Sequence, residues 1–173
     1  MSTNWRISSF NGALLAAYFI PTWTIIAWRI MVSPIQSFYE RPNVSVAFYA
    51  SDFLHFAADG MVRSAWMLAL GRMTVVAFFA IFLVLLTLSV IRRRGNANEA
   101  LAIALGIGSV MCFAMMLMAS YVHEVEAMRL HASELLMLIG NAIVMLVEPP
   151  AEKAPAGQGA ALPLQQAHLV DNA

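Results

Sequence analysis

Apolar residues gather along this chain in four long runs that are separated by short polar segments. The runs cover residues 10–32, 73–91, 100–122 and 127–147. About 20 helical residues are needed to cross a hydrocarbon core of about 30 Å. The last run is free of charged residues only over 135–147, so it reaches this length only if its helix starts near Ala127. The pattern predicts four transmembrane helices.

The segment 33–72 joins the first two runs and contains one amphipathic stretch. On a helix over 44–70, polar side chains share a narrow face: Ser45, Asp52, His55, Asp59 and Arg63. This helix would either cross the bilayer with these charges at depth or lie on its surface with the polar face in water. A fifth span would also move Arg92–Arg94 to the outer side. We therefore predict an interfacial amphipathic helix on the extracytoplasmic side.

Basic residues give the orientation. Arg92–Arg94 lie in the short loop 92–99, and such clusters stay in the cytoplasm. We therefore expect this loop, the N-terminal segment 1–9 and the tail 148–173 to be cytoplasmic. The other side would hold the remaining arginines, namely Arg29, Arg41, Arg63, Arg72 and Arg129. The two sides then carry equal numbers of basic residues, so the orientation depends on the density of the Arg92–Arg94 cluster.

Composition supports a membrane protein. The chain has 173 residues, of which 61% are hydrophobic and 12% are charged, whereas soluble domains carry about 25% charged residues. The net charge of zero excludes a basic field for nucleic acid. The first run exceeds a signal-peptide core and lacks a clear cleavage site, so we expect it to remain as a span. We predict an all-α integral membrane protein of a bacterial inner (plasma) membrane, with a disordered tail rich in Pro, Ala, Gly and Gln.

Histidine and glutamate recur on the extracytoplasmic segment 123–134. His123 and Glu126 are three residues apart, and so are His131 and Glu134, a spacing that brings two side chains together on a helix. Imidazole and carboxylate groups suit zinc, iron or copper(II). With two residues of the amphipathic helix, the candidate ligands are His55, His123, His131, Asp52, Glu126 and Glu134. Together they could hold haem or copper as a cofactor, but we expect solvated polar faces instead, with Glu126 and Arg129 as a surface pair.

The third run carries soft ligands and small residues. Cys112 is flanked by Met111, Met115, Met116 and Met118, which are copper(I) ligands in some membrane proteins and core-packing residues in most. Two stripes have small residues every fourth position, Ala104–Gly108–Cys112 and Ala102–Gly106. Such stripes let a neighbouring helix approach closely.

Glu134 is the most diagnostic polar residue. If the fourth helix starts near Ala127, this carboxylate lies about 10 Å below the outer end, which is too deep for lipid. We expect it to face the bundle and to pair with His131, or with His55 and Arg63 of the amphipathic helix.

The chain carries no phosphate-binding glycine loop, nucleophile elbow or zinc-protease motif. We therefore predict a non-enzymatic accessory, anchor or assembly subunit of a larger membrane complex, in contact with lipid and other membrane subunits. Two alternatives stay open. One is a metal- or haem-binding redox subunit that uses the His/Glu residues. The other is a small transporter or channel with Asn141 and Glu134 as its polar pathway.

Overall fold

The computed structural model describes residues 7–88 and 96–148, and within these ranges all regular structure is helical. The helices are α1 (Ile7–Val32), α2 (Pro34–Phe38), α3 (Val44–Asp52), α4 (Ala58–Thr87), α6 (Asn96–Tyr121) and α7 (Val125–Val147). Of these, α1, α4, α6 and α7 are long and apolar enough to cross a membrane. The predictions of an all-helical chain and of four such helices are therefore confirmed.

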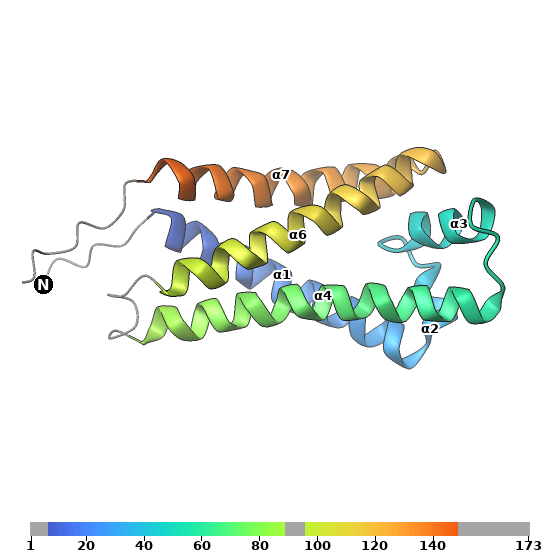
Figure 1. The fold of residues 1–173 in the computed structure, drawn as a ribbon, viewed down its shortest axis with the longest axis horizontal. Helices are drawn as coiled ribbons and strands as arrows, with labels where there is room; N and C mark the ends of the chain where they lie inside the picture. The colour runs from blue at the N-terminus through green and yellow to red at the C-terminus, as the bar shows by residue number, and fades with distance from the viewer. Residues whose placement is uncertain (1–6, 89–95, 149–173) are drawn as a thin grey trace, which may run out of the picture.

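The four long helices run along the long axis of the molecule and form one bundle (Figure 1). Helix α1 packs against α4, α4 against α6, and α6 against α7, while α1 also contacts α7. The start of α1, the end of α4, the start of α6 and the end of α7 lie together at what we name the terminal end. Helices α2 and α3 and the turn between α6 and α7 lie at the opposite end, which we name the α3 end (Figure 1).

The prediction of one continuous amphipathic helix over 44–70 is wrong, because this segment forms parts of two helices. The chain forms α3, leaves the helix between Phe53 and Ala57, and begins α4 at Ala58. In this break His55 has a φ of 51°, the left-handed conformation that ends right-handed helices. The second half of the predicted helix is thus the beginning of α4.

Helix α4 passes through Gly71 and Arg72 without a turn, where the sequence suggested a joint between two elements. A glycine inside a helix costs only about 1 kcal/mol relative to alanine, so it does not end the helix by itself. A Cβ at Gly71 would lie 3.0 Å from the Met111 methyl carbon, so the glycine makes room for α6. The resulting helix of 30 residues is about 45 Å long and places Arg72 near its middle.

The bundle core is aromatic where α1 meets α4. Phe19 stacks on Phe79 with ring centroids 5.7 Å apart, and Trp23 meets Phe19 edge to face at 5.0 Å. All three rings are buried. A second apolar cluster joins α1, α2, α3 and α4 at the α3 end through Ile30, Phe38, Ala47, Ala50 and Ala65. Helices α2 and α3 are therefore packed onto the bundle.

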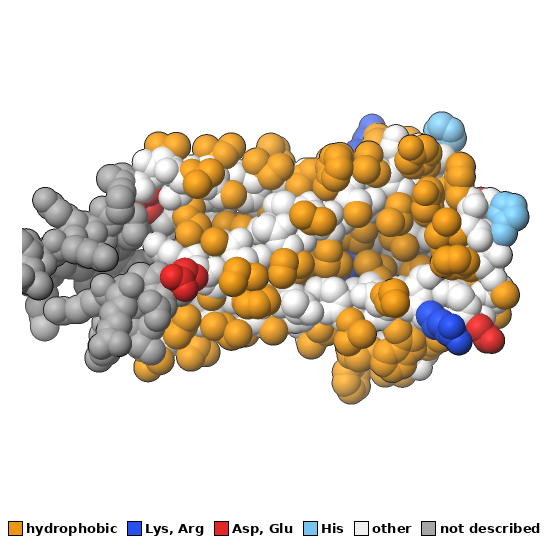
Figure 2. Space-filling view, in the orientation of Figure 1, with side chains coloured by type: hydrophobic (Ala, Val, Ile, Leu, Met, Phe, Trp, Pro, Cys, Tyr) orange, Lys and Arg blue, Asp and Glu red, His pale blue; other side chains and the backbone are white. Residues whose placement is uncertain are grey.

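The outer surface between the two ends is apolar. On the face shown in Figure 2, hydrophobic side chains cover the middle, and most charged and histidine side chains lie towards the ends. Exposed apolar residues of α7 include Leu136, Leu146 and Val147. Such a surface suits contact with lipid if the bundle is embedded in a membrane.

Helix bounds differ from the predicted spans at their ends. Helix α1 starts at Ile7 rather than residue 10, α6 covers 96–121 rather than 100–122, and α7 covers 125–147 rather than 127–147. The disordered tail predicted for 148–173 lies outside the described residues, except for Glu148. The loop residues 92–95 and segment 1–6 lie outside them too.

Candidate functional site

One face of α7 brings polar side chains into the bundle. The buried residues of this helix are Ala127, His131, Glu134, Leu138 and Asn141. They are spaced alternately by four and three residues, so they form a single stripe along the helix. A histidine, a carboxylate and an amide thus point inward from a helix that is otherwise largely apolar. This is the environment expected for Glu134.

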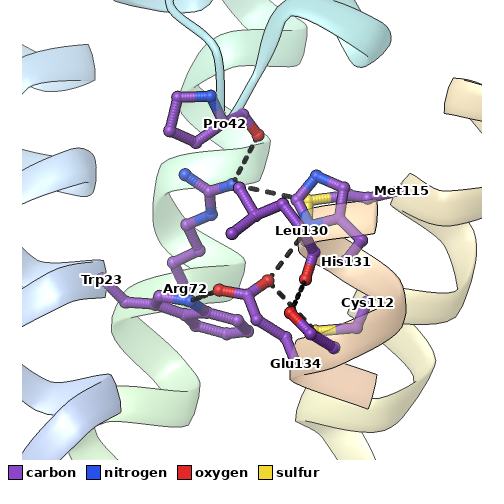
Figure 3. Close-up of polar contacts among 9 residues, drawn as sticks. Trp23, Pro42, Arg72, Cys112, Met115, Leu130, His131 and Glu134 are labelled. Atoms are coloured by element: carbon purple, nitrogen blue, oxygen red, sulfur yellow. Dashed lines mark hydrogen bonds and ion pairs between the residues drawn. The ribbon is translucent and has the colours of Figure 1, made fainter. Parts of the chain in front are cut away.

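Glu134 is only 3% exposed and has a partner on each of three helices (Figure 3). The indole Nε1–H of Trp23, on α1, donates to Oε1 over 3.2 Å. Nδ1 of His131, one turn earlier on α7, lies 3.0 Å from Oε2. The Cys112 thiol, on α6, lies 3.7 Å from the same oxygen. The carboxylate is held from several directions and does not face lipid.

These partners lie at one depth in the bundle. Trp23 is nine residues before the end of α1, Cys112 is nine before the end of α6, and Glu134 is nine after the start of α7. All three helix termini belong to the α3 end, so the residues lie about 14 Å below it at 1.5 Å per residue. The carboxylate is therefore well inside any bilayer that the helices cross.

Helix α4 contributes Arg72, which is 1% exposed. Its Nη2–H donates to the carbonyl oxygen of Pro42 over 3.2 Å and lies 3.4 Å from the Met115 sulfur. Its Cζ lies 5.7 Å from the Trp23 ring centroid, a cation–π distance. We name Trp23, Arg72, Cys112, His131 and Glu134 the polar cluster, to which every long helix contributes.

The charges of the polar cluster balance when Arg72 and Glu134 are ionised and His131 is neutral. The contact with Oε2 assigns the imidazole proton to Nδ1, because a carboxylate only accepts hydrogen bonds. Nε2 then carries a free lone pair. The cluster thus holds one positive and one negative side chain that both contact Trp23, and a histidine whose Nε2 has no hydrogen-bond partner within the described residues.

The hydrogen bonding of this region is incomplete. Among the described residues, the buried side-chain nitrogen and oxygen atoms without a hydrogen-bond partner belong to Asn43, Ser45, Arg72, His131 and Asn141. They include Nε and Nη1 of Arg72, Nε2 of His131, and both polar atoms of Asn141. Buried polar groups are usually paired with protein or with ordered water. Bound water or a small polar ligand is the natural partner for these atoms.

The structure brings together His131 and Glu134 of the six predicted ligands. His55 and His123 are exposed in turns, with φ of 51° and 58°. His123 follows the end of α6, where Glu124 N–H donates to Ala119 O over 2.9 Å, as in a Schellman motif. His123 therefore lies outside the helix that carries Glu126, and the predicted meeting of these two side chains on one helix is wrong. His55 and His123 end helices.

The two remaining predicted ligands lie on the surface. Asp52 is the exposed last residue of α3, and Glu126 forms an exposed ion pair with Arg41 at 3.4 Å. This replaces the surface pair with Arg129 that the sequence suggested. Across residues 7–88 and 96–148, no group of three or more His, Cys, Asp or Glu side chains is arranged to hold a metal ion. The metal or haem site stays a prediction from the sequence.

The soft ligands of α6 belong to the polar cluster and the core. Cys112 and Met115 are buried, but the Arg72 guanidinium lies against the Met115 sulfur. A copper ion at this point would meet a like charge, which disfavours it. Of the two small-residue stripes, Ala104–Gly108–Cys112 is buried, whereas Ala102–Gly106 is exposed.

Sequence reasoning did not place Trp23, Arg72 or Cys112 beside Glu134. Arg72 was placed at the outer interface and is instead buried in the middle of α4. Within the described part of the chain, the contacts of Glu134 come from Trp23, Cys112 and His131 rather than from His55 or Arg63. A usable signal was present, because Ala65, Ala69, Arg72 and Val76 continue one helical face.

The chain matches no model of a known protein family, no curated protein and no solved structure. Its class therefore rests on the fold and the site alone. They define a four-helix bundle of membrane-length helices with a charged, hydrogen-bonded cluster buried between all four.

Proposed function

We propose that this chain is a small proton-translocating membrane protein, a transporter or channel whose working group is Glu134. The observation that supports this is the polar cluster itself, a carboxylate that is 3% exposed and contacted from α1, α6 and α7, with Arg72 of α4 beside it. Ionisable residues at bilayer depth are costly, and they commonly mark proton or ion pathways.

His131 and Glu134 form a two-step relay. A proton from water binds the free Nε2 of His131, and the Nδ1 proton moves to Oε2 of Glu134 across the 3.0 Å contact. One proton enters and one is delivered, so the imidazole stays neutral and changes tautomer. The carboxylic acid then releases its proton to water on the other side, which restores the carboxylate. The starting tautomer returns when water takes the Nε2 proton and, after the imidazole has rotated, another water gives one proton to Nδ1, an exchange with no net charge.

Arg72 and Trp23 keep the carboxylate in place. Arg72 places a positive charge in the same cluster, 5.7 Å from the ring centroid of the Trp23 that binds the carboxylate, and an opposite charge nearby stabilises a buried carboxylate. The indole N–H of Trp23 holds Oε1 and leaves Oε2 facing His131. These are positioning roles, because neither side chain passes on the proton.

A purely structural role explains this arrangement less well. Well-packed apolar side chains hold helices together at least as strongly as a buried ion pair, without its desolvation cost. The unpartnered atoms of Arg72 and His131 also point to water or a ligand rather than to packing. If the cluster is only structural, the experiment below will show no effect of Glu134 on proton flux, and that outcome would favour the accessory-subunit hypothesis.

The orientation belongs to the same proposal. The Arg92–Arg94 cluster favours a cytoplasmic terminal end, with the α3 end outside and α3 at the outer interface. Protons would then reach His131 from the outer side. The neighbouring polar residues Asn43 and Ser45, buried beside α4 at that end, fit such a route.

The test measures proton flux into liposomes that contain purified protein and an internal pH-sensitive dye, driven by a potassium diffusion potential. Glu134→Gln keeps the size and hydrogen bonding of the side chain but carries no acid proton. We expect its flux to fall about tenfold or more. Glu126→Gln, which changes an exposed carboxylate on the same helix, is the matched control and should leave the flux unchanged. Equal flux in Glu134→Gln and the unmutated protein would contradict the proposal.

A further inference from the structure

The polar stripe of α7 continues past the polar cluster towards the terminal end. Asn141 lies seven residues after Glu134 on the same buried face, and Glu148 follows after seven more. Glu148 accepts a hydrogen bond from the Ile7 N–H over 3.0 Å and another from the Ser8 hydroxyl. Polar groups thus recur on one line along the whole length of α7.

Asn141 is the least satisfied residue of this line. It is 4% exposed, and among the described residues neither its Oδ1 nor its Nδ2 has a hydrogen-bond partner. An amide buried between apolar helices without partners is costly, and bound water is its usual solution. Asn141 therefore marks a second hydrated position, about 10 Å from Glu134 along the helix axis at 1.5 Å per residue.

Leu138 separates the two polar positions. It is fully buried and lies one turn from Glu134 on one side and one turn from Asn141 on the other. It packs over Gly108 of α6, where an added Cβ would lie 3.2 Å from Leu138 Cδ1 and 3.5 Å from Val75 Cγ1. Its side chain offers nothing that binds water. The gap of about 10 Å is also far beyond the reach of one hydrogen bond of about 3 Å.

We propose that Leu138 is a hydrophobic gate between the Glu134 relay and the Asn141 position. This inference rests on the proposed proton-translocating function and adds its control point. The polar cluster exchanges protons with the α3 end, and Asn141 and Glu148 lead to the terminal end. A proton passes between them only when the Leu138 side chain moves aside and water fills the gap. Dry apolar constrictions gate other channels in this way.

The gate predicts a gain of flux when Leu138 becomes small and polar. In the liposome assay, Leu138→Ser should conduct about tenfold faster than the unmutated protein, because water can then enter the gap. Leu136→Ser is the matched control, since this leucine is 73% exposed on the outer face of α7. It should leave the flux unchanged. The double variant Leu138→Ser/Glu134→Gln should lose the gain, because the opened path still depends on the carboxylate.

The outcomes separate the gate from the function beneath it. If flux depends on Glu134 but Leu138→Ser and Leu136→Ser behave alike, the gate is refuted and the proposed function stands. If Glu134→Gln changes nothing in either background, the proposed function itself fails. Helix content and a single species on size exclusion establish that each variant folds. If the serine variant does not fold, Leu138→Ala replaces it, since alanine opens space without adding a hydroxyl. Its flux is compared with that of Leu136→Ser in the same way.

Discussion

The electrostatic balance between Arg72 and Glu134 makes a quantitative prediction about stability. Arg72→Met keeps an unbranched apolar stem of similar length and removes the guanidinium. The substitution removes the positive charge of the polar cluster, whose carboxylate is 3% exposed and shares Trp23 with the guanidinium. Removing a buried charged donor costs about 1–3 kcal/mol, because its acceptor and the opposite charge of the cluster lose part of their compensation. The lost hydrogen bond to Pro42, 3.2 Å long, forms part of this cost.

The double variant separates the charge interaction from packing. In Arg72→Met/Glu134→Gln no net charge remains in the polar cluster, and the glutamine oxygen can still accept from Trp23. The free energy of unfolding lost in the double variant should therefore be smaller than the sum of the two single losses by about 1 kcal/mol or more. If the loss in the double variant equals the sum of the two single losses to within about 0.5 kcal/mol, the two charges do not interact and the reasoning is refuted.

The measurement is reversible unfolding in mixed detergent micelles, followed by far-ultraviolet circular dichroism. Arg63→Met is the matched control, because this arginine is exposed near the start of the same helix. Its effect should stay within about 0.5 kcal/mol, as for other surface substitutions. A control loss as large as that of Arg72→Met would assign the effect to α4 as a helix rather than to the buried charge.

Two further predictions concern packing and orientation. Gly12→Ala should destabilise the bundle by about 1–3 kcal/mol, because its Cβ would lie 2.8 Å from Leu101 Cδ2. Gly106→Ala is the control and should be neutral or slightly stabilising, because nothing lies within 4 Å of its Cβ. Equal losses of stability in thermal unfolding would contradict this packing. In a Cys112→Ala background, Asp52→Cys should react with an impermeant thiol reagent in intact cells, since α3 is proposed to lie outside. Protection of that cysteine until the cells are opened would reverse the orientation.

The sequence determined the helices and the depth of one carboxylate. In lipid, a long apolar run must satisfy its backbone hydrogen bonds within itself, which a helix does. Its helical form and membrane length therefore follow from composition and periodicity alone. The same reasoning placed Glu134 on the inward face and named His131 as one of two alternative partners, and the structure has His131 Nδ1 3.0 Å from the carboxylate. The buried face of α7 follows from spacing within one helix, which a sequence displays directly.

Only the tertiary structure decided which side chains from different helices meet. Trp23, Arg72 and Cys112 come from three other helices, and no spacing along the chain shows that they share one depth and one face with Glu134. The break at His55 was equally hidden, because a non-glycine residue in the left-handed conformation carries no clear sequence mark. The amphipathic pattern continues across that break, so it predicted one interfacial helix up to residue 70. For this reason Arg72, which follows directly, was wrongly placed at the interface. Local pattern fixes the form of a helix, whereas the partners of a buried charge depend on how separate helices pack.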